Sequence, residues 1–209
     1  MLTSLRLATP VIGILRGVDQ DFFGEIMQAS FSMGLEAIEV TMNTAGAERI
    51  VSRHRGLVPA GKYLGMGTVR NLDEAERAVA AGAMFLVTPN LDQTVIGLAR
   101  SQKVPVIVGA LTPTEVYSAW AAGADMIKIF PCGALGGARY IRDLRGPFDQ
   151  VKLVAVGGVT LENAVEYFNA GAAGVGVSSS LFGRQALVER DIDRLAENVG
   201  KFLARCPVS

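Results

Sequence analysis

Four copies of one short pattern recur along the chain and constrain its fold more than any other feature. In each copy, a stretch with helical periodicity ends in small residues around a glycine, and an apolar, strand-like run follows directly. Glycine suits the residue after a helix because it adopts positive φ without a steric penalty. The pattern therefore predicts repeated helix-to-strand connections of the kind found in βα units. The copies span 32–38, 80–86, 121–127 and 169–175.

Eight strand candidates lie between and after these connections, which is the number that a (β/α)₈ barrel needs. We therefore predict an α/β fold in which residues 1–209 form a single TIM-barrel domain. The main alternative is a doubly wound open sheet, which needs a glycine-rich fingerprint after its first strand. The segment 16–19 contains only Gly17. The strand candidates are 11–16, 37–42, 63–69, 84–89, 104–111, 126–131, 152–157 and 174–179.

Amphipathic helices are predicted in the gaps, and some carry clear start signals. A helix over 71–81 has two acidic residues in its first turn, which complement the helix dipole. Before the next one, Thr112 is the expected N-cap and Glu115 completes a capping box. Thr160 is expected to cap the seventh helix in the same way.

Composition excludes several classes of partner and location. The 209 residues are 50% hydrophobic, and 20 basic residues balance 20 acidic ones, so neither nucleic acid nor an anionic membrane is an expected partner. No apolar stretch is long enough to span a bilayer, and the first ten residues lack a signal-peptide core. Cys132 and Cys206 give no disulfide framework, and His54 is the only histidine, so no metal site is expected. We expect a cytoplasmic location, and the basic cluster 49–55 is predicted to be a solvated helix face.

Lys128 interrupts an apolar strand and is the first candidate for a catalytic residue. Because side chains alternate along a strand, Ile127 and Ile129 share one face and Lys128 points to the other. Burial disfavours a charged amine, and a neutral lysine can form a Schiff base with a carbonyl substrate. The alternative is a lysine whose stem is buried while its ammonium group reaches water at the strand end.

Glu39 lies between Ile38 and Val40 in the second strand candidate. If these two neighbours face the helices, Glu39 points into the barrel, where it can exchange protons near Lys128. A structural ion pair between Glu39 and Lys128 is the alternative.

Other polar residues lie where strands end, which is where a barrel forms its active site. Arg16 ends the first strand candidate and Thr68 lies at the end of the third, although a surface arginine and a helix-capping threonine are equally open interpretations. Glycines and serines follow the seventh and eighth strands, where barrels bind phosphate through backbone N–H groups. The candidates for this phosphate site are Gly157, Gly158, Ser178 and Ser179.

With these residues in place, the chain resembles the 2-keto-3-deoxy-6-phosphogluconate / 4-hydroxy-2-oxoglutarate aldolase family, class I enzymes on a (β/α)₈ barrel. The resemblance runs from Pro10 to about Phe182. Six segments carry it in order: AIEVT at 37–41, GMGTV at 65–69, VTPN at 87–90, PVIVG at 105–109, IKIFP at 127–131 and VGGVT at 156–160.

The resemblance implies roles for the candidate residues. Lys128 is expected to form the Schiff base, Glu39 to act as general acid and base, and Thr68 to help hold the keto-acid carboxylate. The glycines and serines named above are expected to bind phosphate. The expected substrate-binding set also includes Arg16, Asn43, Pro89 and Phe130. The family needs no metal or other cofactor and is typically homotrimeric.

Two departures from the gluconate branch bear on the substrate. The segment 42–44 after the glutamate strand lacks the arginine usual in that branch, and Val156 stands where that branch tends to have threonine. With the opening 14–17, these features look more like the 6-phosphogalactonate branch, in which Arg16 would contact the carboxylate or another part of the substrate.

We therefore predict a carbon–carbon lyase that cleaves 2-dehydro-3-deoxy-6-phosphogalactonate to pyruvate and glyceraldehyde 3-phosphate. The gluconate epimer or 4-hydroxy-2-oxoglutarate is the alternative substrate. A sugar-phosphate epimerase on the same barrel and a sugar-phosphate-binding protein without activity are the other possibilities.

Overall fold

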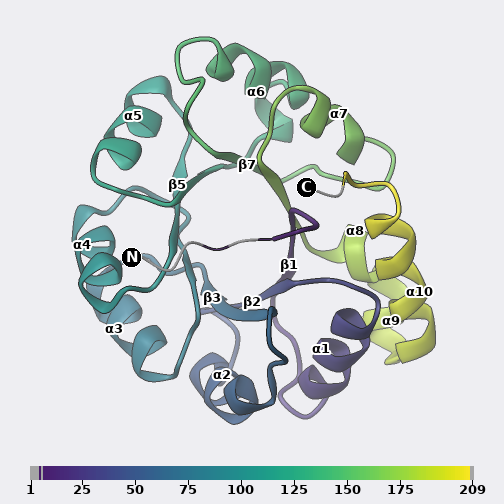
Figure 1. The fold of residues 1–209 in the computed structure, drawn as a ribbon. Coiled ribbons are helices and arrows are strands. Elements are labelled where there is room, and N and C mark those ends of the chain that lie inside the picture. Colours follow the sequence, from purple (N-terminus) through teal and green to yellow (C-terminus); the bar gives the residue numbers. More distant parts are fainter. Residues whose placement is uncertain (1–4, 6, 208–209) are drawn as a thin grey trace.

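Eight parallel strands close into a barrel in the computed structural model, which describes residues 5 and 7–207 (Figure 1). Each strand pairs with its neighbour in sequence, and β8 returns to pair with β1. This is the predicted (β/α)₈ TIM barrel, and an open doubly wound sheet is excluded because the ring of strands is complete. The strands are β1 (Val11–Leu15), β2 (Ala37–Thr41), β3 (Tyr63–Gly67), β4 (Leu86–Val87), β5 (Val106–Ala110), β6 (Met126–Ile129), β7 (Leu153–Val156) and β8 (Gly174–Val177).

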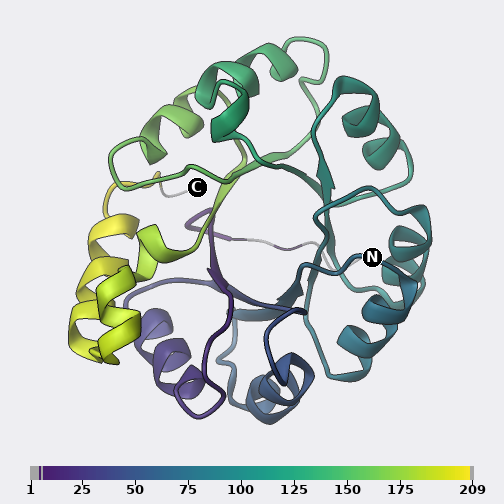
Figure 2. The same cartoon turned by 180° about the vertical axis from the view of Figure 1, so that it is seen from behind.

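All eight strands lie inside their predicted ranges, and the helices surround them as an outer layer, which both views show (Figures 1 and 2). Two short 3₁₀ turns, η1 (Arg55–Leu57) and η2 (Gly133–Leu135), follow α2 and β6. The helices are α1 (Phe23–Ser32), α2 (Ala47–His54), α3 (Leu72–Ala80), α4 (Gln93–Gln102), α5 (Pro113–Ala121), α6 (Ala138–Arg145), α7 (Ala164–Asn169), α8 (Ser179–Phe182), α9 (Arg184–Glu189) and α10 (Ile192–Leu203).

The repeated glycines are helix-to-strand connections, as predicted. All four have φ between 90° and 100°, the left-handed region that side chains rarely adopt. Each one ends a helix and lets the chain turn back toward the barrel within a few residues. The four are Gly34, Gly82, Gly123 and Gly171.

Two of the predicted helix starts are confirmed and one is wrong. The Asn71 side chain caps α3 by accepting from Glu74 N, and Thr112 forms a complete capping box with Glu115. Thr160 does not cap the seventh helix, because α7 begins only after Asn163. Instead, the Thr160 N–H donates to the side chain of Asn163.

The alternation of side chains separates two apolar clusters. Ile38, Val40, Ile127 and Ile129 pack between the strands and the helices. A smaller cluster fills the barrel interior and includes Ile12, Phe85 and Ile107. Leu5 and Leu7 join this interior cluster near the amino ends of the strands. The carboxyl ends of the strands remain open for a site.

The basic cluster at 49–55 is a solvated helix face only in part. Arg49, Arg53 and Arg55 are exposed, but His54 is buried, which corrects the prediction for this residue. Its Nδ1 lies 2.8 Å from the Ile50 carbonyl oxygen, and its ring packs edge-on against Phe23. The last turn of α2 faces α1 here, so tertiary packing covers the histidine.

In the described part of the chain, no helix is both long and apolar enough to cross a membrane.

Candidate active site

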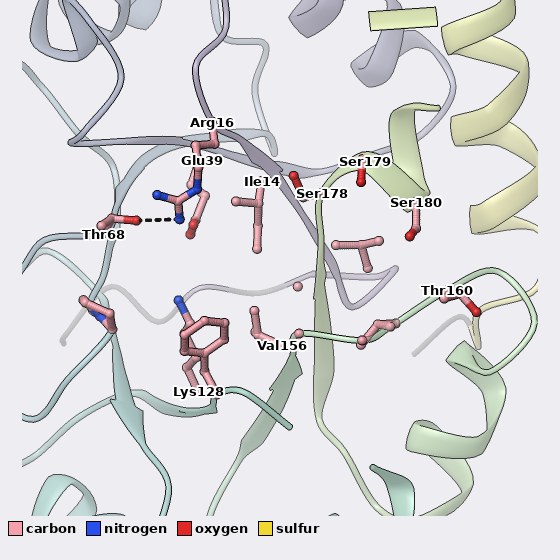
Figure 3. A pocket seen from close by; sticks show the side chains of 17 residues that line it. Ile14, Arg16, Glu39, Thr68, Lys128, Val156, Thr160, Ser178, Ser179 and Ser180 are labelled. Carbon is pink, nitrogen blue, oxygen red and sulfur yellow. Dashed lines mark hydrogen bonds between the residues drawn. The ribbon is translucent and has the colours of Figure 1, made fainter. Parts of the chain in front are cut away.

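A pocket lies at the carboxyl ends of the strands and brings together residues from across the chain (Figure 3). Ten of the eleven predicted site residues line it. The eleventh, Asn43, lies beside the pocket and accepts a hydrogen bond from Arg16. The ten are Arg16, Glu39, Thr68, Pro89, Lys128, Phe130, Gly157, Gly158, Ser178 and Ser179.

Lys128 points into this pocket from the interior face of β6, with only 5% of its surface exposed (Figure 3). Burial lowers its pKa from the usual range for lysine, the nearby Arg16 charge lowers it further, and Glu39 opposes both effects. Its Nζ lies 4.9 Å from the centroid of the Phe130 ring. The amine is therefore largely shielded from solvent, which favours its neutral, nucleophilic form.

Glu39 enters the pocket from β2, and its backbone pairs with Ile14 on one side and Gly65 on the other. It is 1% exposed, and burial raises its pKa to about 7, against the opposing charges of Lys128 and Arg16. A carboxyl group with this pKa changes its protonation near neutral pH, which suits an acid–base catalyst.

Glu39 and Lys128 form no salt bridge, although the structure describes both side chains. Neither side chain forms a hydrogen bond to another described residue. The interpretation of a purely structural ion pair therefore lacks the contact on which it depends. Both groups are left facing the space between them (Figure 3).

Arg16 is held above this pair by two neighbours from other strands. Its guanidinium donates to Asn43 Oδ1 at 2.8 Å. It also donates to Thr68 Oγ1 at 3.2 Å (Figure 3). Thr68 has φ of 55°, which is unusual for a β-branched residue. The Thr68 hydroxyl accepts from Arg16 and α3 is capped by Asn71, so the helix-cap interpretation of Thr68 is wrong. Arg16 keeps N–H donors for a carboxylate.

The other end of the pocket has a different character. It is lined by the loop after β7 and by the serines that follow β8 (Figure 3). Gly157 and Gly158 have φ of 88° and 83°. The cations that line the pocket, Arg16 and Lys128, both lie at the opposite end (Figure 3). An anion bound here would depend on backbone N–H groups and hydroxyls.

Some residues that line the pocket were not predicted, although simple rules point to several of them. Ile14 precedes Arg16 by two positions and Gly176 precedes Ser178 by two, so each shares a strand face with a predicted residue. Ser180 extends the serine cluster by one. Val159 and Thr160 continue the loop after Gly158, and no periodicity pointed to them.

No group of three or more histidine, cysteine, aspartate or glutamate side chains in the described residues could hold a metal ion. Cys132 and Cys206 are both buried, and burial raises the pKa of each thiol to about 11.

Comparison with known proteins agrees with this geometry. The family model described as "KDPG and KHG aldolase" matches residues 3–198. A 2-dehydro-3-deoxy-6-phosphogalactonate aldolase from Escherichia coli K12 is 34% identical over 189 residues, which cover 90% of this chain and 91% of the relative.

Two solved structures are similar over nearly the whole chain. The KDPG aldolase of Legionella pneumophila, captured with pyruvate as a covalent carbinolamine intermediate, is 26% identical with a TM-score of 0.87, covering 94% of this chain and 95% of that one. A cube-shaped protein cage designed by fusing symmetric oligomeric domains is 31% identical with a TM-score of 0.87, covering 94% of this chain and 72% of that one.

Proposed function

The chain belongs to the KDPG and KHG aldolase family, and from this we propose that it cleaves 2-dehydro-3-deoxy-6-phosphogalactonate to pyruvate and glyceraldehyde 3-phosphate. The observation that carries the proposal is the pair of Lys128 and Glu39. Both are buried in one pocket, both have pKa values shifted toward their neutral forms, and no salt bridge joins them. An amine and a carboxyl group so placed can perform nucleophilic and proton-transfer steps together.

Lys128 acts as the nucleophile in this proposal. Its neutral amine attacks the C2 ketone, and loss of water from the carbinolamine leaves an iminium ion. Because the iminium nitrogen is positively charged, it accepts the electron pair of the C3–C4 bond when that bond breaks. The product on the enzyme is an enamine of pyruvate.

Glu39 moves the protons. As a carboxylate it removes the proton of the C4 hydroxyl while the C3–C4 bond breaks, which releases the aldehyde. As a carboxylic acid it then returns a proton to C3 of the enamine, and hydrolysis of the resulting iminium frees pyruvate and Lys128. With a pKa of about 7, the group can occupy either state at neutral pH.

Two ends of the pocket position the substrate. The guanidinium of Arg16, fixed by Asn43 and Thr68, is suited to a planar carboxylate. The loop at Gly157 and Gly158 and the serines after β8 offer donors to a phosphate. Pro89 and Phe130 also line the pocket, and the Phe130 ring packs beside the Lys128 amine.

The choice of the galactonate epimer rests on similarity and on two positions. The Escherichia coli relative is named for that substrate. The segment 42–44 after β2 lacks the arginine that is usual in the gluconate branch, and Val156 lines the pocket without a hydroxyl. The gluconate epimer, and 4-hydroxy-2-oxoglutarate, remain the second candidates because the matched family covers both activities.

A side-by-side assay tests the substrate, with pyruvate release from each epimer coupled to a dehydrogenase. We expect a higher kcat/KM for the galactonate, and a higher value for the gluconate would reverse the assignment. Borohydride reduction in the presence of pyruvate tests the Schiff base separately. No adduct, together with proton exchange on a sugar phosphate, would instead identify an epimerase.

The same family membership leads us to propose a homotrimer in the cytoplasm. Tyr117 and Trp120 on α5 stack edge-to-face while 55% and 42% exposed, which is unusual for large aromatic side chains. The designed cage that resembles this chain was built from symmetric oligomeric domains. The two cysteines are free thiols, as is usual in a reducing compartment.

A further inference from the structure

Two carbonyl groups in the loop after β7 are tied to residues on the side of the loop that faces away from the pocket. The Gly157 carbonyl accepts a hydrogen bond from Gly133 N at 2.8 Å. The Gly158 carbonyl accepts one from Asn163 Nδ2 at 2.9 Å. Neither Gly133 nor Asn163 lines the active-site pocket, whereas Gly157, Gly158 and Val159 do.

The direction of each carbonyl determines where the next N–H points. In a trans peptide unit the C=O and the N–H are antiparallel, because the unit is planar. Because the Gly157 carbonyl is held away from the pocket, the Gly158 N–H points toward it. In the same way, the Gly158 carbonyl is held away from the pocket, so the Val159 N–H points toward it. Neither N–H donates a hydrogen bond to another residue that the structure describes, so both are available to a ligand.

Asn163 controls this arrangement from both ends of its amide. While Nδ2 donates to Gly158, Oδ1 accepts from Thr160 N at 2.8 Å and turns that N–H away from the pocket. The side chain makes no capping bond to α7, although it occupies the N-cap position. Its polar contacts thus go to the loop and not to the helix.

We propose that Asn163 is a positioning residue that directs the Gly158 and Val159 N–H groups at the substrate phosphate. The proposal rests on the function proposed above. Because no lysine or arginine among the described residues lines this end of the pocket, the orientation of these two donors decides how well a phosphate binds. Asn163 acts through the loop, without touching the substrate.

The test uses the condensation direction, in which pyruvate reacts with either D-glyceraldehyde 3-phosphate or D-glyceraldehyde. For Asn163→Ala we expect the KM of the phosphorylated aldehyde to rise roughly ten- to a hundredfold, the loss expected for hydrogen bonds to a charged group. The KM of pyruvate and the rate with D-glyceraldehyde should stay within about twofold. The inhibition constant of inorganic phosphate should rise in parallel with the first KM.

Asn163→Asp covers the case in which the alanine variant folds poorly. It keeps an acceptor for Thr160 N but replaces the donor to Gly158 with a carboxylate oxygen, so the KM rise should be at least as large. Asn71→Ala is the matched control, because the Asn71 side chain likewise accepts from a backbone N–H at a distance of three residues, in this case the following Glu74 N, but lies outside the pocket. This variant should leave the KM of the phosphorylated aldehyde and the rate with D-glyceraldehyde unchanged.

Three results would overturn the role of Asn163. The first is an equal loss of activity with the two aldehydes, and the second is the same KM rise in Asn71→Ala. The third is an unchanged KM in both Asn163 variants. These results leave the proposed function standing, provided that the wild type prefers the phosphorylated aldehyde. A wild type without that preference would instead refute the phosphate end of the site, and the role of Asn163 with it.

Discussion

Lys128 lies on the interior face of β6, where burial and Arg16 both favour the neutral amine. Lys128→Arg should abolish cleavage, because a guanidinium stays protonated and cannot form an imine. The measurement is borohydride trapping with pyruvate, followed by peptide mapping. Lys152→Arg is the matched control, since Lys152 is exposed and precedes β7, and it should trap pyruvate like the wild type. An adduct that persists in Lys128→Arg would remove this residue from the mechanism.

A second prediction for a single residue concerns the proton-transfer role of Glu39. Glu39→Gln keeps the shape of the side chain and removes the titrating group, so kcat should fall roughly 10²–10⁴-fold. The variant should still form the borohydride adduct, because Lys128 is intact. Cleavage at nearly the wild-type rate would mean that the carboxylate is structural.

The same carboxyl group gives a pH dependence with a definite sign. Its pKa is about 7 in the folded protein and 4.5 as the reference value, so between these pH values the folded state binds more protons than the unfolded state. Stability from this group is therefore full below about pH 4.5 and is lost as the pH rises through 7. Urea unfolding of the wild type and Glu39→Gln should show the variant gaining relative stability between pH 5 and pH 8. A constant difference would show that Glu39 does not titrate there.

At the scale of elements, the small residues of β3 and β5 make room for the site. A β-carbon on Gly67 would overlap the Glu39 carboxylate, and one on Gly109 would overlap the backbone of Pro89. These strands therefore need glycine at positions where most interior residues of the barrel are larger. Neither glycine has positive φ, so the backbone conformation does not require glycine there. The requirement comes from the close approach of residues on neighbouring strands.

Gly67→Ala tests this steric requirement. The added methyl group should push the Glu39 carboxylate away, and a misplacement of this kind can cost about 10²-fold in kcat. Pyruvate trapping should be preserved, because Lys128 is on the opposite side of the barrel (Figure 3). Gly97→Ala on α4 is the control, since a β-carbon there meets no atom within 4 Å. Unchanged kcat in Gly67→Ala would show that Glu39 can move without loss.

At the scale of the whole molecule, we propose that the exposed pair Tyr117 and Trp120 on α5 lies in the contact between subunits of the proposed trimer. Trp120→Glu would place a charge in an interface that buries this pair, and it should convert trimers to monomers in light scattering or sedimentation. Val188→Glu is the control, because Val188 is 74% exposed on α9 and its change should not affect assembly. A trimeric Trp120→Glu would place the contact elsewhere.

Local pattern was enough to determine a large part of this protein. The glycine connections follow from backbone sterics, and so does the alternation of side chains between the two faces of each strand. Both effects act over a few residues. That is why Glu39 and Lys128 could be assigned to the barrel interior, and why the capping box at Thr112 was correct.

Only the tertiary structure decided the rest, because those features depend on residues far apart in the chain. Closing the barrel brings Arg16 to Thr68, 52 positions away, and packing α1 on α2 buries His54. The Gly133–Gly157 bond depends on the neighbouring strand loop. Thr160 carries a capping signal, yet the Asn163 amide binds the loop and moves the start of α7. Local propensity is a small free energy, and the contacts made when the barrel closes outweigh it.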